Sequence, residues 1–141
     1  MKKILIFLGI VIVVIFVAIV NFSAYKIEKD RIITYNSEFE QYKNKELFGL
    51  DLATVINKAI DQNTKNEVLK DDKGNFISND ENSIEIEIYM KDNEKIYKME
   101  TFYNAGTEKF VEYYGSIKFK CSKIEYHEKT GRIKYIYFEQ L

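Results

Sequence analysis

The feature that most constrains this chain is an uninterrupted apolar run near its amino terminus, from Ile4 to Val20, without a charged or hydrogen-bonding side chain. A helix over this run is roughly 25 Å long at about 1.5 Å per residue, slightly shorter than the hydrocarbon core of a bilayer at about 30 Å. Phe22 and Tyr25 follow the run, and aromatic side chains are typical anchors in the headgroup region. The run therefore predicts a transmembrane helix, and the sequence has no second segment of this kind.

The residues around the run indicate how it is used. Met1–Lys3 is a short basic segment, which the positive-inside rule keeps in the cytoplasm. Cleavage by signal peptidase requires small residues at two positions, and Ala18–Val20 and Phe22–Ala24 each place a large residue at one of them. An uncleaved transmembrane signal anchor over residues 1–23 is therefore favoured over a cleaved signal peptide. Residues 24–141 are then expected to form a domain outside the cytoplasm, in a single-pass protein of the cell membrane.

Composition excludes several classes of protein. The chain has 21 basic and 22 acidic residues, without the basic excess of a nucleic-acid-binding protein, so we expect no nucleic-acid partner. Cys121 is the only cysteine and His127 the only histidine. Neither an intrachain disulfide nor a structural zinc site can therefore form. About 120 residues remain after the anchor, enough for one domain with one core.

Helical periodicity follows the anchor, and helices are expected within residues 24–62. The segment Ala24–Lys45 has no glycine or proline, which favours a helix that continues out of the membrane. Its apolar residues step by three and four and form one stripe, namely Ile32, Tyr35, Phe39 and Tyr42. After a break at Gly49, Asp51 is a plausible N-cap of a second helix. The apolar face of that helix comprises Leu52, Val55, Ile56, Ala59 and Ile60.

Residues 67–139 read as β structure with one short helix. The clearest strand is Ser83–Met90, in which Ile84, Ile86 and Ile88 alternate with polar residues. The other expected strands are Glu67–Lys70, Phe76–Ile77, Lys95–Phe102, Ser116–Tyr126 and Arg132–Phe138, and the short helix is Thr107–Tyr114 with Thr107 as its N-cap. Because helices come first and strands follow, we expect an α+β fold with a small antiparallel sheet that packs on the two amphipathic helices.

The last two strands predict a hairpin with apolar residues on both faces. Gly131 suits the left-handed position of the connecting turn. If His127 faces Arg132, then Glu125 faces Lys134 and Cys121 faces Phe138. In this register one face carries Ile117, Phe119, Cys121, Ile136 and Phe138. The other face carries Ile124, Tyr126, Ile133, Tyr135 and Tyr137, which are the candidate contact surface, with burial in the core as the alternative.

No pattern indicates catalysis. The segment 71–81 is rich in Asp and Asn and could offer oxygens to Ca²⁺, but it lacks the spacing of an EF-hand and reads as turns. His127 lies beside a turn without a nearby nucleophile, and Cys121 is expected to be a small buried hydrophobic residue. The glycines are isolated, so no phosphate-binding loop is present. We therefore expect no enzyme activity, no catalytic residues, no cofactor and no metal.

Two resemblances accompany these inferences. An apolar helix that continues into an amphipathic helix and is followed by a small sheet resembles the layout of type IV pilins and pseudopilins. Residues 2–8 read KKILIFL, however, and lack the prepilin cleavage motif. Separately, Phe48-Gly49-x-Asp51 and the segment Tyr126-His127-x-x-Thr130-Gly131-Arg132-Ile133 look similar to unannotated one-pass membrane proteins of low-GC Gram-positive bacteria. That similarity implies no particular activity.

These observations predict a membrane-anchored extracytoplasmic interaction or structural module, such as an accessory part of a pilus-like or secretion apparatus in the cell envelope. Its expected partners are the lipid bilayer and other envelope proteins or a second copy of itself. The alternative is a sensor or ligand-binding domain that holds a small molecule or a cell-wall glycan on the tyrosine-rich sheet face. A deep pocket lined by several tyrosines would favour the alternative, and a flat face would favour the interaction module.

Overall fold

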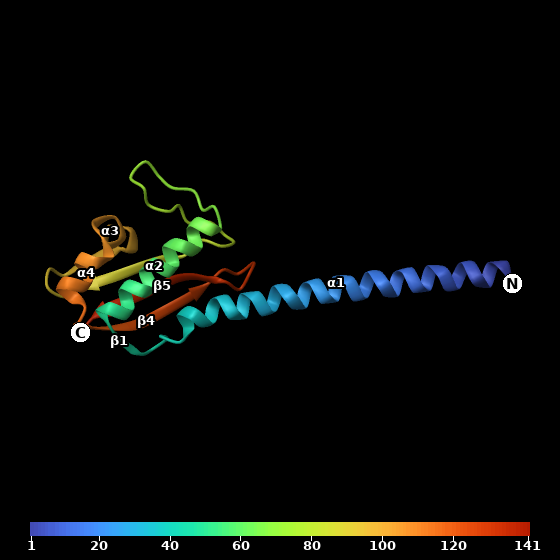
Figure 1. The fold of residues 1–141 in the computed structure, drawn as a ribbon, viewed down its shortest axis with the longest axis horizontal. Helices are drawn as coiled ribbons and strands as arrows, with labels where there is room; N and C mark the ends of the chain where they lie inside the picture. Colours follow the sequence, from blue (N-terminus) through green and yellow to red (C-terminus); the bar gives the residue numbers. More distant parts are fainter. The chain divides into compact units, whose positions relative to one another are not determined.

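The computed structural model describes residues 1–141, which form two compact units, Met1–Tyr35 and Asn36–Leu141. The first unit consists of most of helix α1 (Lys2–Glu40), which is long and apolar enough to cross a membrane (Figure 1). The predicted continuation of the apolar helix beyond Ala24 is confirmed. The helix ends at Glu40 rather than Lys45 because a turn follows, in which Asn44 adopts a left-handed φ of 58°.

The second unit, called here the C-terminal domain, contains five strands and three further helices (Figure 1). In chain order they are β1 (Glu46–Phe48), α2 (Gly49–Lys65), β2 (Glu85–Met90), β3 (Lys95–Lys98), α3 (Met99–Ala105), α4 (Thr107–Tyr114), β4 (Lys118–Tyr126) and β5 (Ile133–Gln140). The strands form one sheet in the order β1-β4-β5-β2-β3. The α+β class is therefore confirmed.

The sheet is mixed, whereas the sequence predicted an antiparallel one. Strands β1 and β5 both pair antiparallel with β4, so they run in the same direction. Helix α2 then carries the chain back, so that β2 also runs in the direction of β1 and pairs parallel with β5. The predicted β2–β3 hairpin is antiparallel, as expected.

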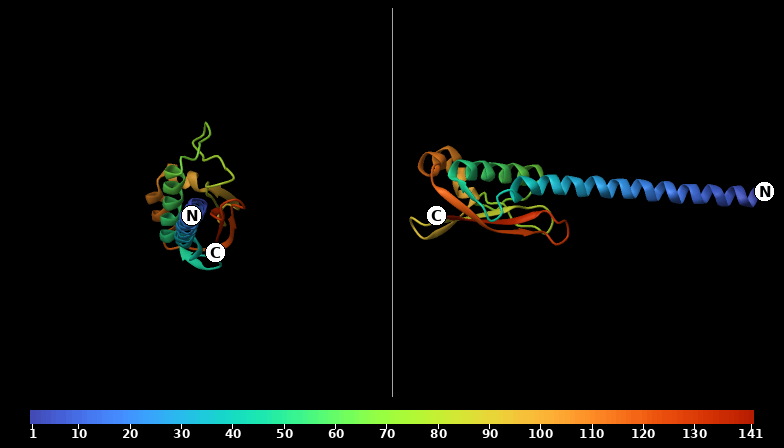
Figure 2. Two further views of the ribbon diagram at one scale, coloured as in Figure 1. Left: turned by 90° about the vertical axis from the view of Figure 1, so that its right-hand side faces the viewer. Right: turned by 90° about the horizontal axis from the view of Figure 1, so that it is seen from below.

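One face of the sheet carries the core. The alternation predicted for β2 is confirmed, since Ile86, Ile88 and Met90 are buried while the intervening residues are partly exposed. Helices α2, α3 and α4 lie on the same side of the sheet (Figure 2). They supply the other half of the core together with the last turn of α1, and the fully buried large side chains include Phe39, Leu52, Ile56, Ile84 and Met99.

Several predicted boundaries were wrong for local reasons. The predicted strand Lys95–Phe102 ends at Lys98, because Met99 and Glu100 are both buried and begin α3. Two neighbouring buried residues do not fit the alternation of a strand. The Glu100 carboxylate accepts the Phe76 backbone N–H at 3.1 Å. The predicted strands Glu67–Lys70 and Phe76–Ile77 reduce to one bridge between Lys70 and Phe76.

Neither predicted helix cap is used. Phe48 occupies the N-cap position of α2 and Gly106 that of α4, without a side-chain capping bond at either helix. Helix α2 starts earlier than Asp51 because Gly49 packs against the end of α4. A Cβ at Gly49 would lie 2.0 Å from the Tyr114 carbonyl oxygen, so this approach requires glycine.

Candidate contact surface

The β4–β5 hairpin contains two β-bulges that decide where its aromatic residues point. The predicted ends of the register are confirmed: the His127 N–H donates to the Arg132 carbonyl at 2.8 Å, and Cys121 pairs with Phe138. Between these ends, register shifts leave Lys134 and Ser122 without a paired residue, so Glu125 faces Tyr135 instead of Lys134. Each bulge reverses the phase of the alternation along its strand.

The five predicted contact residues therefore do not share one face. Ile133 is fully buried, and Tyr126 is its cross-strand partner. Ile124 pairs with the buried Ile136 and points to the same side of the sheet, toward the helices. Only Tyr135 and Tyr137 lie on the opposite face, so the predicted register, which put all five residues on one face, is wrong.

This opposite face, called here the outer sheet face, is not covered by the helices of the domain (Figure 2). Three tyrosines lie on its central strand β5 and on the neighbouring strand β2, namely Tyr135, Tyr137 and Tyr89. The alternation of β2 predicts that Tyr89 points away from the core, but the sequence does not place it beside Tyr135 and Tyr137, because the pairing of β2 with β5 is not visible in the sequence. The other outward side chains are Glu46 and Phe48 of β1, Lys118, Lys120, Lys123 and Glu125 of β4, Glu139 of β5, Glu85 and Glu87 of β2, and Ile96 and Lys98 of β3.

Polar contacts connect the strands across the outer sheet face. The Tyr135 hydroxyl donates to Glu87 Oε2 at 2.8 Å. Lys123 Nζ lies 5.6 Å from the centroid of the Tyr135 ring and forms an ion pair with Glu125. Burial, and then the bond to Glu87, raise the pKa of Tyr135 above its ordinary value. The tyrosine is held as a neutral donor in a network that spans β4, β5 and β2.

Tyr126 belongs instead to the region where the chain enters the domain. Its hydroxyl donates to Glu40 Oε1 at 2.7 Å, and Lys43 Nζ lies 5.8 Å from its ring centroid. Burial and the hydrogen bond to Glu40 raise the pKa of Tyr126 from 10.0 to about 12. Tyr126 therefore fastens the last turn of α1 to the hairpin.

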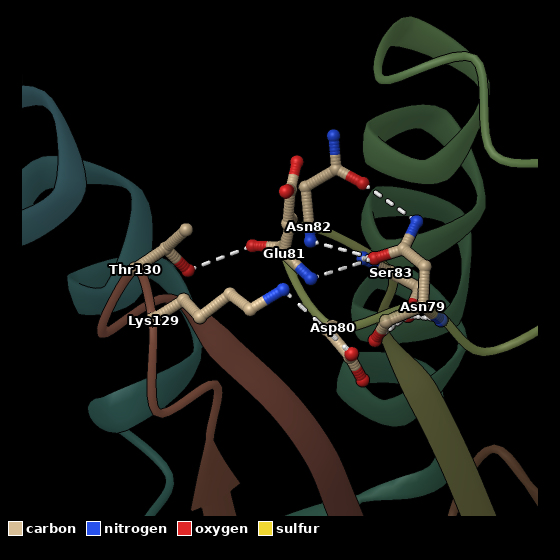
Figure 3. Close-up of polar contacts among 7 residues, drawn as sticks. All are labelled: Asn79, Asp80, Glu81, Asn82, Ser83, Lys129 and Thr130. Atoms are coloured by element: carbon tan, nitrogen blue, oxygen red, sulfur yellow. Dashed lines mark hydrogen bonds and ion pairs between the residues drawn. The ribbon is translucent and has the colours of Figure 1, made fainter.

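The hairpin tip is held by the loop that precedes β2 (Figure 3). The Asn79 side-chain oxygen accepts backbone N–H groups at 2.8–3.1 Å from the next residues of the loop, Glu81, Asn82 and Ser83. The Thr130 hydroxyl donates to the Glu81 carbonyl at 2.7 Å. Lys129 Nζ lies 3.8 Å from Asp80 Oδ2, the ion pair drawn beside it in Figure 3. The loop and the tip form one polar unit without a catalytic arrangement.

The residues that most often carry chemistry have structural roles. His127 is buried, and its Nε2 lies 2.7 Å from the Ser83 carbonyl oxygen, so it packs the turn rather than lying on the surface. Cys121 is buried as predicted, and burial raises the pKa of its thiol, which disfavours a reactive thiolate. No group of three or more His, Cys, Asp or Glu residues is arranged to hold a metal ion.

Two of the hollows on the domain are large enough for a small molecule. One of about 710 Å³ has a mostly charged lining and a single tyrosine, and its residues are Asp80, Glu125, Tyr126, His127, Glu128, Lys129 and Lys134. The other, of about 470 Å³, lies between the turn after α1 and the β1–β4 edge, and includes Tyr42, Phe48 and Lys118. Neither gathers the tyrosines of the outer sheet face.

Comparison with known proteins adds no family. No protein-family model, curated protein or solved structure matches the chain. A functional interpretation therefore rests on the chemistry of the apolar helix α1 and of the outer sheet face.

Proposed function

We propose that this chain is a single-pass, membrane-anchored interaction module whose C-terminal domain lies outside the cytoplasm and binds a protein partner through its outer sheet face. The apolar part of α1 is the anchor, and the bilayer is its first partner. The module serves as an accessory or structural part of an assembly in the cell envelope, such as a pilus-like or secretion apparatus.

One observation carries the proposal: three tyrosines occupy the middle of a sheet face that no helix of the domain covers. Tyrosine is enriched at protein interfaces because its ring supplies contact area at low entropic cost and its hydroxyl finds a hydrogen-bond partner. Charged residues surround these tyrosines, in the manner of a polar rim around an interface centre. Tyr135 is already oriented by its bond to Glu87, which reduces the ordering cost of binding.

The shape of the domain favours this function over a small-molecule sensor. Ligand sites are usually concave and largely apolar, with a few convergent polar groups. The larger of the two hollows described above is lined mainly by charged side chains and contains one tyrosine. The aromatic residues are instead spread over an open sheet, which suits a broad partner better than a small one.

A photo-crosslinking amino acid in place of Tyr137 tests the proposal in intact membranes of the host. This replacement is expected to give a discrete product of higher mass on illumination. The matched control is the same change at Tyr113, a tyrosine of α4 that is 74% exposed on the helical side of the domain. A product at neither position, or equal products at both, would contradict a contact through the outer sheet face.

A further inference from the structure

We propose that the partner of the outer sheet face is a second copy of this chain, docked face to face about a two-fold axis that runs along β5, between the two sheets. This inference rests on the proposed function and names its partner. Two observations carry it: the order of charges across the strands, and the place where the chain enters the domain.

The charges on the outer sheet face alternate in sign on either side of β5. From one edge to the other, β1 presents Glu46, β4 presents mainly lysines, β2 presents Glu85 and Glu87, and β3 presents Lys98. The predominant charges of β4 and β2, the two strands that flank β5, are therefore opposite in sign. A rotation about an axis along β5 sets β4 of one copy over β2 of the other, so that lysines meet glutamates. It also sets β1 over β3, where the register places Glu46 opposite Ile96 of the second copy.

The row at the centre of the face fits this rotation residue by residue. Cross-strand pairing aligns Lys123, Tyr137, Glu87 and Lys98 in one row. Rotation about β5 keeps the height of each residue along the strands, so Lys123 meets the second copy's Glu87 and Tyr137 meets its own counterpart. Packed sheets are about 10 Å apart, a distance that Lys and Glu side chains reaching from both sides can span.

The neighbouring rows contain one favourable and two unfavourable contacts in the same arrangement. Lys120 lies in the row of Tyr89, so its ammonium group reaches the ring of the second copy's Tyr89 as a cation–π contact. Glu139 of β5 lies in the row of Lys120 and Tyr89, on the axis, so it meets its own counterpart, which is unfavourable. Another row places Glu125 near the second copy's Glu85, which is also unfavourable. Glu125 is already paired with Lys123 within its own chain, which reduces this repulsion.

The position of the first residue of the C-terminal domain favours the same two-fold axis. Asn36, the first residue of the C-terminal domain, donates through Nδ2 to the Gly131 carbonyl at 2.8 Å and accepts the Ile133 N–H at 3.0 Å, so it lies at the start of β5. A rotation about β5 leaves this point at the same end of both copies, as two chains anchored in one membrane require. An axis across the strands would place the two entry points at opposite ends and would set the lysines of β4 over each other.

Charge reversal in the full-length chain, reconstituted in lipid nanodiscs, tests the inference. Lys123→Glu places glutamate against the second copy's Glu87, and Glu87→Lys places lysine against Lys123, at both symmetry-related contacts. Each single variant is expected to self-associate at least about tenfold more weakly than the unchanged chain, a loss on the order of that caused by juxtaposed like charges. Lys109→Glu on α4, an exposed position, makes the same charge change on the helical side and should leave association unchanged.

Mixing the two single variants gives the decisive result. In a mixed pair, the glutamate introduced at position 123 of one chain faces the lysine introduced at position 87 of the other. The second contact joins the native Lys123 to the native Glu87, so both contacts again join opposite charges. The mixture is therefore expected to form a heterodimer at close to the affinity of the unchanged chain, although each variant alone self-associates at least about tenfold more weakly. Thermal melting of each variant shows whether its fold is intact, and a mixed pair can form only from folded chains.

Other results would overturn the inference. Unaltered self-association of the single variants, or no heterodimer in the mixture, would exclude this face-to-face pair. If the unchanged chain is monomeric but position 137 crosslinks to a different protein, the self-association proposal fails and the interaction function stands. If position 137 gives no crosslink at all, both proposals fail together.

Discussion

Asn63 is a polar residue with no exposed surface, at the carboxyl-terminal end of α2. Its side-chain amide donates to the Ile84 carbonyl and accepts the Ile84 N–H, both at 2.8 Å. The amide thus takes the place of a neighbouring strand just before β2 begins. It connects the helical layer to the sheet, because it supplies hydrogen bonds to the Ile84 backbone groups, which would otherwise be buried without partners.

Asn63→Ala is expected to destabilise the domain by about 2–4 kcal/mol, because it leaves two buried backbone groups unsatisfied. The measurement is the denaturant midpoint and slope of unfolding. Asp61→Ala, two residues earlier on an exposed position of α2, serves as the control and should change stability little. Equal midpoints for the two variants would show that the Asn63 amide is not a stabilising contact.

The contact of Tyr126 should make the stability of the domain depend on pH in the alkaline range. The pKa of Tyr126 is raised by burial and by its bond to Glu40, from 10.0 to about 12. Because the folded pKa exceeds the unfolded one, this contact stabilises the domain fully below pH 10 and is lost as the pH rises through about 12. The difference in unfolding midpoint between the unchanged chain and Tyr126→Phe should therefore be constant below pH 10 and shrink above it. A difference that does not vary with pH would contradict this role of Tyr126.

At the scale of elements, the alternation of buried and exposed residues along β2 determines which substitutions the domain tolerates. Ile86 is buried on the inner side, and Glu87 is partly exposed on the outer sheet face. Ile86→Asp should unfold the domain, because an unpaired carboxylate in the core costs several kcal/mol of a net stability of about 5–15 kcal/mol. Glu87→Ala should shift the melting temperature only slightly. Similar melting temperatures for the two variants would mean that the inner and outer faces of β2 are wrongly assigned.

The elements that repeat one clear period could be predicted from the sequence. The apolar run of α1, the face of α2 with Leu52 and Ile56, and the alternation of β2 each indicated the right structure. In β5, by contrast, apolar residues occur at both odd-numbered and even-numbered positions, so the sequence alone allows Ile133 on either face. The bulge at Lys134 puts it in the core, and nothing in the local sequence marks that bulge.

Contacts between distant segments account for the rest. The parallel pairing of β2 with β5 depends on how α2 returns the chain, and this brought Tyr89 beside the tyrosines of β5. The strand β1 has only three residues, and its stability comes from pairing with β4, so no local pattern could reveal it. Of the three tyrosines of the outer sheet face, only Tyr135 and Tyr137 were thus predicted to share one surface.

At the scale of the whole molecule, the apolar part of α1 predicts that the protein behaves as an integral membrane protein and not as a peripherally attached one. The full-length protein should remain in the membrane fraction after a high-salt or carbonate wash, because burial of such a segment far exceeds the binding energy of a surface helix. Deletion of residues 1–22 should release the protein into the supernatant. Recovery of the full-length protein in the supernatant would contradict the anchor.

The central claim is that the anchor presents the C-terminal domain outside the cytoplasm, where its outer sheet face can meet a partner. Lys2 and Lys3 favour this orientation, although Lys26 and Lys29 on the other flank oppose it. The most direct measurement is labelling of Tyr113→Cys with a membrane-impermeant maleimide in intact cells without a wall. Position 113 is exposed and the native Cys121 is buried, so the introduced thiol reports the location of the domain. We expect labelled protein that stays with the washed cells, whereas labelling only after lysis would contradict the claim.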